Sequence, residues 1–118
     1  GPIPAGTPLA RLIPNPDDMA TQWRAATGAM QVNHMVVVKE AVARQHSDVI
    51  RALWRLLLEA KRAAGPIGPG ELDLHPFGVD ANRRNLEIAI EYVYEQRLIP
   101  RRFTVDELFD DTTRTLNP

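Results

Sequence analysis

Hydrophobic and polar positions recur along this chain with spacings that predict several helices and one strand. The clearest helical spacing runs over about 48–64, where apolar residues return every three or four positions. Its apolar positions are Val49, Ile50, Leu53, Trp54, Leu57 and Ala60, widened by Leu56 and Leu58. Because these side chains cover so much of the helix, we expect it to be buried on more than one side.

Three further helices are expected, at about 16–27, 81–96 and 105–110. The first follows an Asn-Pro-Asp-Asp start and ends at Gly28, and the second carries an apolar face that includes Leu86 and Ile90. We also expect a short helix before the main one. Expected N-terminal caps are Asn15, Ser47, Asp80 and Thr104, the last with Glu107 three residues later in a capping box.

Residues 32–38 form an apolar, β-branched run that predicts a buried strand. A polar pair, Asn33 and His34, lies near its start, where an α/β protein would place ligand-facing groups. One strand cannot bury itself. Its partners are therefore expected in another part of the protein or in another molecule.

Two regions divide the chain. Residues 1–15 are rich in proline and predict an extended arm, whereas residues 16–118 carry the helices. The Gly-Pro-Ile-Gly-Pro-Gly sequence predicts a loop over 65–76, which need not separate domains.

Composition narrows the class of protein. Of the 118 residues, 44% are hydrophobic and 25% charged, as in globular proteins, and the formal net charge is −1. That charge gives no general electrostatic reason to expect nucleic acid or an anionic membrane as a partner. With no cysteine and no long apolar run, we expect a cytoplasmic protein without disulfides or membrane spans.

Histidine provides the first candidate for chemistry. His34 could act as a general acid or bind a carboxylate, since imidazole exchanges a proton near neutral pH. It could equally be a structural residue bonded to the backbone. His46 and His75 are interpreted as capping and loop residues, and the histidine spacing indicates no metal site.

Arginine provides the second set of candidates for chemistry. Arg83 lies in the first turn of the helix at 81–96, where the helix dipole disfavours a cation, so a carboxylate partner is expected there. Arg102, in a neighbouring arginine pair, is a second candidate for binding an anion. Either arginine could instead belong to an ordinary salt-bridged surface.

Three ordered motifs resemble the C-terminal part of the 4,5-dihydroxyphthalate decarboxylase family, itself similar to type 2 periplasmic solute-binding proteins. The first joins Thr27-Gly28 to His34 and the run 35–38, and the second is Phe77 to Arg83. The third comprises Glu95-Gln96, Leu98, Pro100-Arg101-Arg102 and Asp106-Glu107-Leu108-Phe109. This chain departs from the family with Gln31 in place of a proline and Arg97 in place of a glycine.

The resemblance implies an α/β fold of two lobes, of which this chain supplies the C-terminal portion: one hinge strand at 32–38 and the helices. It also implies decarboxylation of a hydroxylated aromatic carboxylate without a redox cofactor; it leaves any other cofactor unknown. His34 would donate a proton or orient the carboxylate, Asn33 would bind a ring oxygen, and Arg83 or Arg102 would bind a carboxylate. As a segment, the chain alone is expected to be inactive.

Two other functions are compatible with the same residues. The fold could serve only to bind a small anionic or aromatic ligand, or the chain could be a small helical interaction protein. In the last case the lone strand would be completed in a homo-oligomer, as an intermolecular sheet or a swap.

Overall fold

The computed structural model describes residues 3–118, and within this range the chain is built from helices and loops without a strand. The α-helices are α1 (Pro16–Thr27), α2 (Glu40–Gln45), α3 (Ser47–Ala63) and α4 (Val79–Glu95). Two short 3₁₀ helices follow, η1 (Val105–Leu108) and η2 (Thr113–Thr115). The helices expected at 16–27, 48–64 and 81–96 are therefore confirmed to within two residues, and that at 105–110 is a shorter 3₁₀ turn.

The expected α/β fold with a hinge strand at 32–38 is wrong for this chain. Residues 29–39 are extended, but they belong to no sheet, and Val36 and Val37 are 68% and 86% exposed. A strand requires a neighbouring backbone for its hydrogen bonds, and no other part of residues 3–118 supplies one. The β-branched residues of this run favour an extended backbone, but a sheet forms only where a second strand lies alongside.

A small core joins α4 to the C-terminal segment. Val79, Leu86, Ile90 and Val105 are its buried members, and Ile99 and Phe109 pack against it. The predicted capping box is present at the start of η1, where the Glu107 carboxylate accepts hydrogen bonds from the Thr104 N–H (2.7 Å) and hydroxyl (3.1 Å), and Val105 of the same turn lies in the core.

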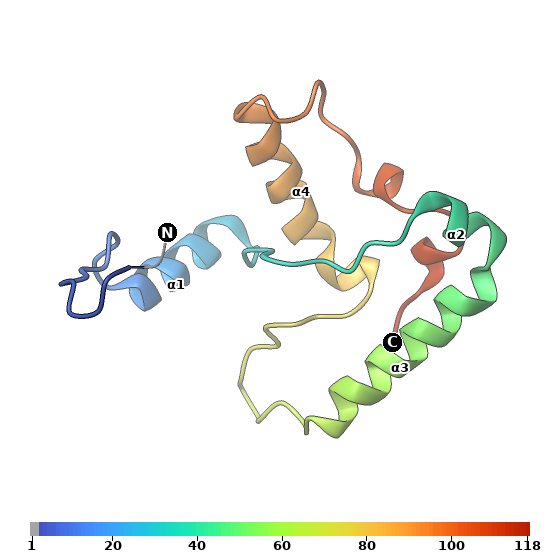
Figure 1. Ribbon diagram of the computed structural model, residues 1–118, viewed down its shortest axis with the longest axis horizontal. Coiled ribbons are helices and arrows are strands. Elements are labelled where there is room, and N and C mark those ends of the chain that lie inside the picture. The colour runs from blue at the N-terminus through green and yellow to red at the C-terminus, as the bar shows by residue number, and fades with distance from the viewer. Residues whose placement is uncertain (1–2) are drawn as a thin grey trace.

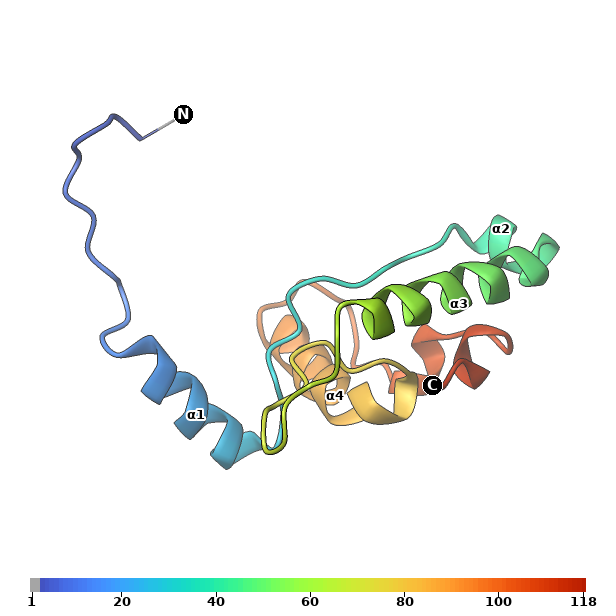
Figure 2. The same cartoon turned by 90° about the horizontal axis from the view of Figure 1, so that it is seen from below.

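Helix α3 is much less buried than its apolar pattern predicted. Ile50 is its only buried residue, while Val49, Leu53 and Leu56 are exposed. Figures 1 and 2 show α3 as a long rod beside the C-terminal segment, with only the start of α4 near it and α2 folded back at its N-terminal end. The expectation of burial on more than one side is wrong here because too little chain covers the helix.

Helix α1 and the arm before it project from the rest of the molecule in both views (Figures 1 and 2). The Trp23 indole Nε1 donates to the Tyr92 hydroxyl of α4 at 3.0 Å, and the two rings are 6.4 Å apart. Gly28 ends α1 in a left-handed conformation, as the sequence predicted, with its N–H bonded to the Arg24 carbonyl. Every residue of the arm from 3 to 15 is exposed.

Two of the expected helix caps differ from those observed. Asn15 is the N-cap residue of α1 as expected, although it has a left-handed backbone and makes no capping bond through its side chain. Ser47 and Asp80 lie inside the first turns of α3 and α4, and the residues that precede these helices are His46 and Gly78. Within residues 3–118, no helix is both long and apolar enough to cross a membrane.

Candidate functional site

The extended segment 29–39 begins at a firm anchor on α4. Asn85 is buried (7% exposed), and its Oδ1 accepts a hydrogen bond of 2.7 Å from the Met30 N–H. Arg84 Nε donates to the Thr27 carbonyl at 2.9 Å. These two contacts hold the residues just before Asn33 and His34 against the first half of α4.

Asn82, three residues before Asn85 on α4, is also part of this anchor. Its Nδ2 donates to the carbonyls of Pro76 (2.7 Å) and Gly78 (2.9 Å), and its Oδ1 accepts from Asn85 Nδ2 at 3.2 Å. The second family-like motif, Phe77 to Arg83, therefore ties the loop before α4 to the segment that follows α1. Its asparagine has a positioning role that the sequence pattern did not reveal.

Beyond this anchor, Asn33 and His34 lie on an exposed stretch of chain. Neither side chain makes a hydrogen bond or ion pair with any other residue in the described range 3–118. Their neighbours Met35, Val36 and Val37 are exposed apolar residues. The imidazole is thus free to meet a ligand, on a surface whose apolar character favours being covered.

The two predicted arginines lie elsewhere, on α4 and the C-terminal segment, and both are engaged. Arg83 donates to Asp106 at 3.0 and 3.4 Å. Arg102 forms a two-pronged pair with Glu91, with both contacts at 2.6 Å, and its guanidinium lies 4.1 Å from the centre of the Tyr94 ring. No hydrogen bond or ion pair joins these arginines to Asn33 or His34 among the residues that the structure describes.

Ion pairs set the protonation of this region. Hydrogen bonds from Arg83 and Arg102 lower the pKa of Asp106 and of Glu91, respectively. The neighbouring pair of Arg101 with Glu107 has the largest effect. Hydrogen bonds from Arg101, and then from Thr104, lower the pKa of Glu107 from 4.5 to about 2.

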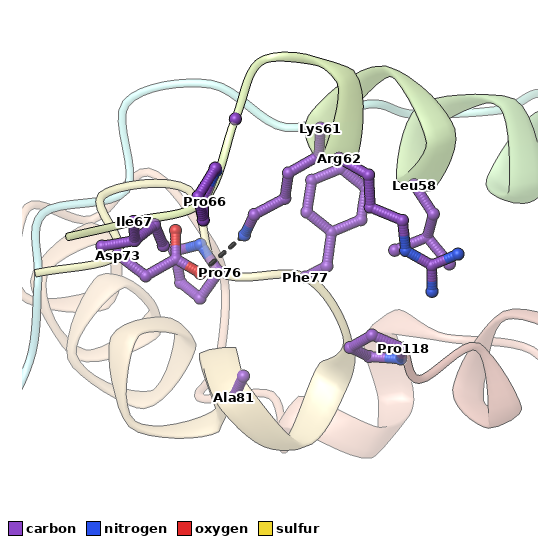
Figure 3. A pocket seen from close by; sticks show the side chains of 11 residues that line it. Leu58, Lys61, Arg62, Pro66, Ile67, Asp73, Pro76, Phe77, Ala81 and Pro118 are labelled. Carbon is purple, nitrogen blue, oxygen red and sulfur yellow. Dashed lines mark hydrogen bonds and ion pairs between the residues drawn. The ribbon is translucent and has the colours of Figure 1, made fainter. Parts of the chain in front are cut away.

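A separate open cleft lies between the C-terminal end of α3, the loop at 65–76 and the start of α4 (Figure 3). It has a volume of about 500 Å³, within the range of small-molecule sites. Its lining is mostly apolar and includes Leu58, Pro66, Ile67, Pro76, Phe77 and Pro118.

Lys61 is the central polar group of this cleft (Figure 3). Its ammonium donates to Asp73 Oδ2 and to the His75 carbonyl, each at 2.6 Å, and lies 5.0 Å from the centre of the Phe77 ring. The hydrogen bond from Lys61 lowers the pKa of Asp73, so this carboxylate is a poor base. The Lys61–Asp73 pair ties the loop at 65–76 to α3, and because both side chains are engaged with each other, neither is well placed to act as a catalytic group.

Arg62 is the remaining cation of the cleft. Its side chain extends past Leu58, away from the Lys61–Asp73 pair (Figure 3), and pairs with no carboxylate among residues 3–118. An aromatic acid could place its ring beside Phe77, whose ring is 5.3 Å from that of Trp54, and its carboxylate near Arg62. This cleft could not be predicted from the sequence, because Lys61 and Arg62 follow the ordinary polar spacing of a helix end.

Within residues 3–118, no group of three or more His, Asp or Glu side chains is placed to hold a metal ion. Comparisons with protein-family models, with curated proteins and with solved structures found no match to this chain. The resemblance to the decarboxylase family therefore stays a prediction based on the three motifs.

Proposed function

We propose that this chain is part of a decarboxylase that acts on a hydroxylated aromatic carboxylate such as 4,5-dihydroxyphthalate. The single observation that carries the proposal is the position of His34: an unengaged imidazole on an exposed apolar segment. An aromatic acid needs both an apolar surface for its ring and a polar group for its carboxylate or ring oxygen. The three ordered motifs supply the reason to choose decarboxylation.

The chemistry requires little from the protein beyond orientation and a proton. A ring hydroxyl allows a keto-like tautomer, which accepts the electron pair left when the bond between ring carbon and carboxylate breaks and CO₂ leaves. A proton then takes the place of CO₂ on that carbon. His34 would donate the proton or orient the carboxylate, and Asn33 would bind a ring oxygen.

Arg83 and Arg102 remain the proposed ligands of a substrate carboxylate. Each guanidinium already holds a carboxylate side chain in two-pronged geometry, so a substrate would have to replace Asp106 or Glu91. Both pairs are partly exposed to solvent, where such an exchange costs little. Because His34 lies on a different segment, substrate binding at both places would need a cleft completed by further polypeptide.

The test is CO₂ release from 4,5-dihydroxyphthalate by the protein expressed from its full reading frame. His34→Gln should lower turnover by at least about 100-fold, the usual size of a general-acid contribution. His75→Gln is the matched control and should retain activity. Full turnover by the His34→Gln protein would remove the proposal.

A second candidate function, favoured by the cleft beside Arg62 and Phe77, is non-catalytic binding of a small anionic or aromatic ligand. Equilibrium binding of benzoate, followed through tryptophan fluorescence, tests this function. Arg62→Gln should weaken binding about tenfold, the loss of one charged hydrogen bond, while Arg11→Gln in the arm should not. Saturable binding without CO₂ release would favour this candidate, and no binding would exclude it for benzoate.

The exposed segment at 32–38 is also compatible with the expected homo-oligomer, in which two copies would associate through this segment. Unpaired backbone groups and exposed valines could be covered by a second copy. Val37→Lys should then abolish the association without changing the helix content, as measured by sedimentation and circular dichroism.

A further inference from the structure

Helix α3 carries an exposed apolar stripe that nothing else in the described chain covers. Its members are spaced four, three, four and three residues apart, as in the seam of two packed helices, and all are exposed: Val49, Leu53, Leu56, Ala60 and Ala63. Leu56, at the centre, is 62% exposed. This stripe lies beside the face that carries Ile50 and Leu57, so it is a second apolar face of the same helix.

The exposed area of the whole chain is larger than a folded monomer of this mass should have. It is 9609 Å² for 13.2 kDa, whereas a compact monomer would expose about 6,400 Å². The projecting arm and α1 account for part of the excess of about 3,200 Å². The exposed Val49, Leu53 and Leu56 of α3 contribute to it as well, so this helix retains apolar area that a partner can bury.

The charges beside the stripe indicate which partner and which orientation. Arg55 and Glu59 lie on its polar flank, are exposed, and form no ion pair within residues 3–118. If two copies of α3 pack antiparallel about Leu56, Arg55 of each copy comes beside Glu59 of the other. A parallel pair would instead turn this charged flank toward the opposite, apolar flank of the other copy, which carries Ile50 and Leu57.

We infer that α3 is the dimerisation helix of this protein, with a second copy packed antiparallel on the stripe centred at Leu56. Two reciprocal Arg55–Glu59 pairs would fix the register at its polar edge. The net charge of −1 per chain opposes the association only weakly. This inference is independent of the proposed chemistry, because it concerns a helix that carries neither His34 nor Asn33.

Sedimentation velocity over a range of protein concentrations tests the inference. The 118-residue chain should sediment at twice its own mass of 13.2 kDa, and Leu56→Lys should raise the dimer dissociation constant by at least about 100-fold because it buries an unpaired charge. Leu98→Lys changes an equally exposed leucine outside α3 and should leave the dimer intact. Circular dichroism should show that Leu56→Lys keeps its helix content, since Leu56 is exposed in the single chain. If Leu56→Lys loses helix, the dissociation constant of Val49→Lys is measured in its place.

A charge reversal tests the orientation. Arg55→Glu should raise the dissociation constant about tenfold, and combining it with Glu59→Arg should restore it to within about threefold of the original. A monomer at every concentration would overturn the inference. So would a dimer that persists in Leu56→Lys but is lost in Val37→Lys, which would assign the association to residues 32–38.

Discussion

Arg97 occupies a backbone conformation that usually belongs to glycine. Its φ is 60°, and it follows the last turn of α4, where its own N–H bonds to Tyr94 and the N–H of Leu98 bonds to the Val93 carbonyl. These two bonds form a Schellman cap, which requires a left-handed residue at this position. The cap is therefore formed by a residue whose Cβ is disfavoured in this left-handed conformation.

Arg97→Gly should therefore stabilise the protein by about 1 kcal/mol, because glycine adopts this conformation without the penalty that a Cβ brings. Urea unfolding measures the change. Gln96→Gly is the matched control: Gln96 has a φ of −77°, so glycine relieves nothing there and should destabilise. A loss of stability in Arg97→Gly would contradict this account of the cap.

Glu107 links the capping box to Arg101, and its low pKa makes that link sensitive to acid. A group whose pKa falls on folding stabilises the protein above its unfolded pKa and loses this effect as the pH falls through the folded value. For Glu107 the window runs from 4.5 down to about 2. Glu107→Gln should thus lower the free energy of unfolding at pH 7, and the deficit should vanish as the pH approaches 2.

Chemical unfolding at a series of pH values between 7 and 2 provides the measurement. Glu95→Gln is the control, because the side chain of Glu95 makes no hydrogen bond or ion pair among residues 3–118. A deficit in Glu107→Gln that stays constant down to pH 2 would show that the carboxylate charge is not responsible.

At the scale of elements, α4 organises the molecule because it anchors the segments on both of its sides. Asn85 connects it to Met30, and the buried Val79, Leu86 and Ile90 connect it to the C-terminal segment. The core of α4 could be predicted from the spacing of its apolar residues. The role of Asn85 could not, since the sequence does not show which distant backbone group an asparagine will meet.

Asn85→Ala should destabilise the protein by about 1–3 kcal/mol, because the half-buried Met30 N–H loses its acceptor. Thermal unfolding measures this loss, and amide exchange at Met30 should quicken with it. Glu95→Ala changes an exposed residue of the same helix and should have little effect. Slow exchange at Met30 in Asn85→Ala would mean that another group holds this segment.

For the other elements, the sequence predicted helix positions well and burial poorly. The spacing in α3 defined where the helix lies, yet Leu53 and Leu56 are exposed because apolar periodicity shows which face can be buried and not what covers it. The run at 32–38 failed for a related reason. Its residues favour an extended backbone, but a sheet also needs a second strand, which no local pattern could provide.

At the scale of the whole molecule, the chain is extended for its length. The radius of gyration of its Cα atoms is 17.7 Å, against about 13.5 Å for a compact domain of 118 residues. The exposed segment with His34 and the uncovered stripe of α3 both follow from this shape. The predicted site residues consequently divide between two places, Asn33 and His34 on the segment and Arg83 and Arg102 in ion pairs near α4.

The central functional claim is that His34 meets an aromatic carboxylate, and side-chain NMR of the three histidines tests it most directly. Titration with 4,5-dihydroxyphthalate should shift the ring signals of His34 in a saturable manner, while those of His46 and His75 serve as internal controls and stay in place. Saturable binding that leaves the His34 signals unmoved, or that shifts His75 instead, would contradict the account.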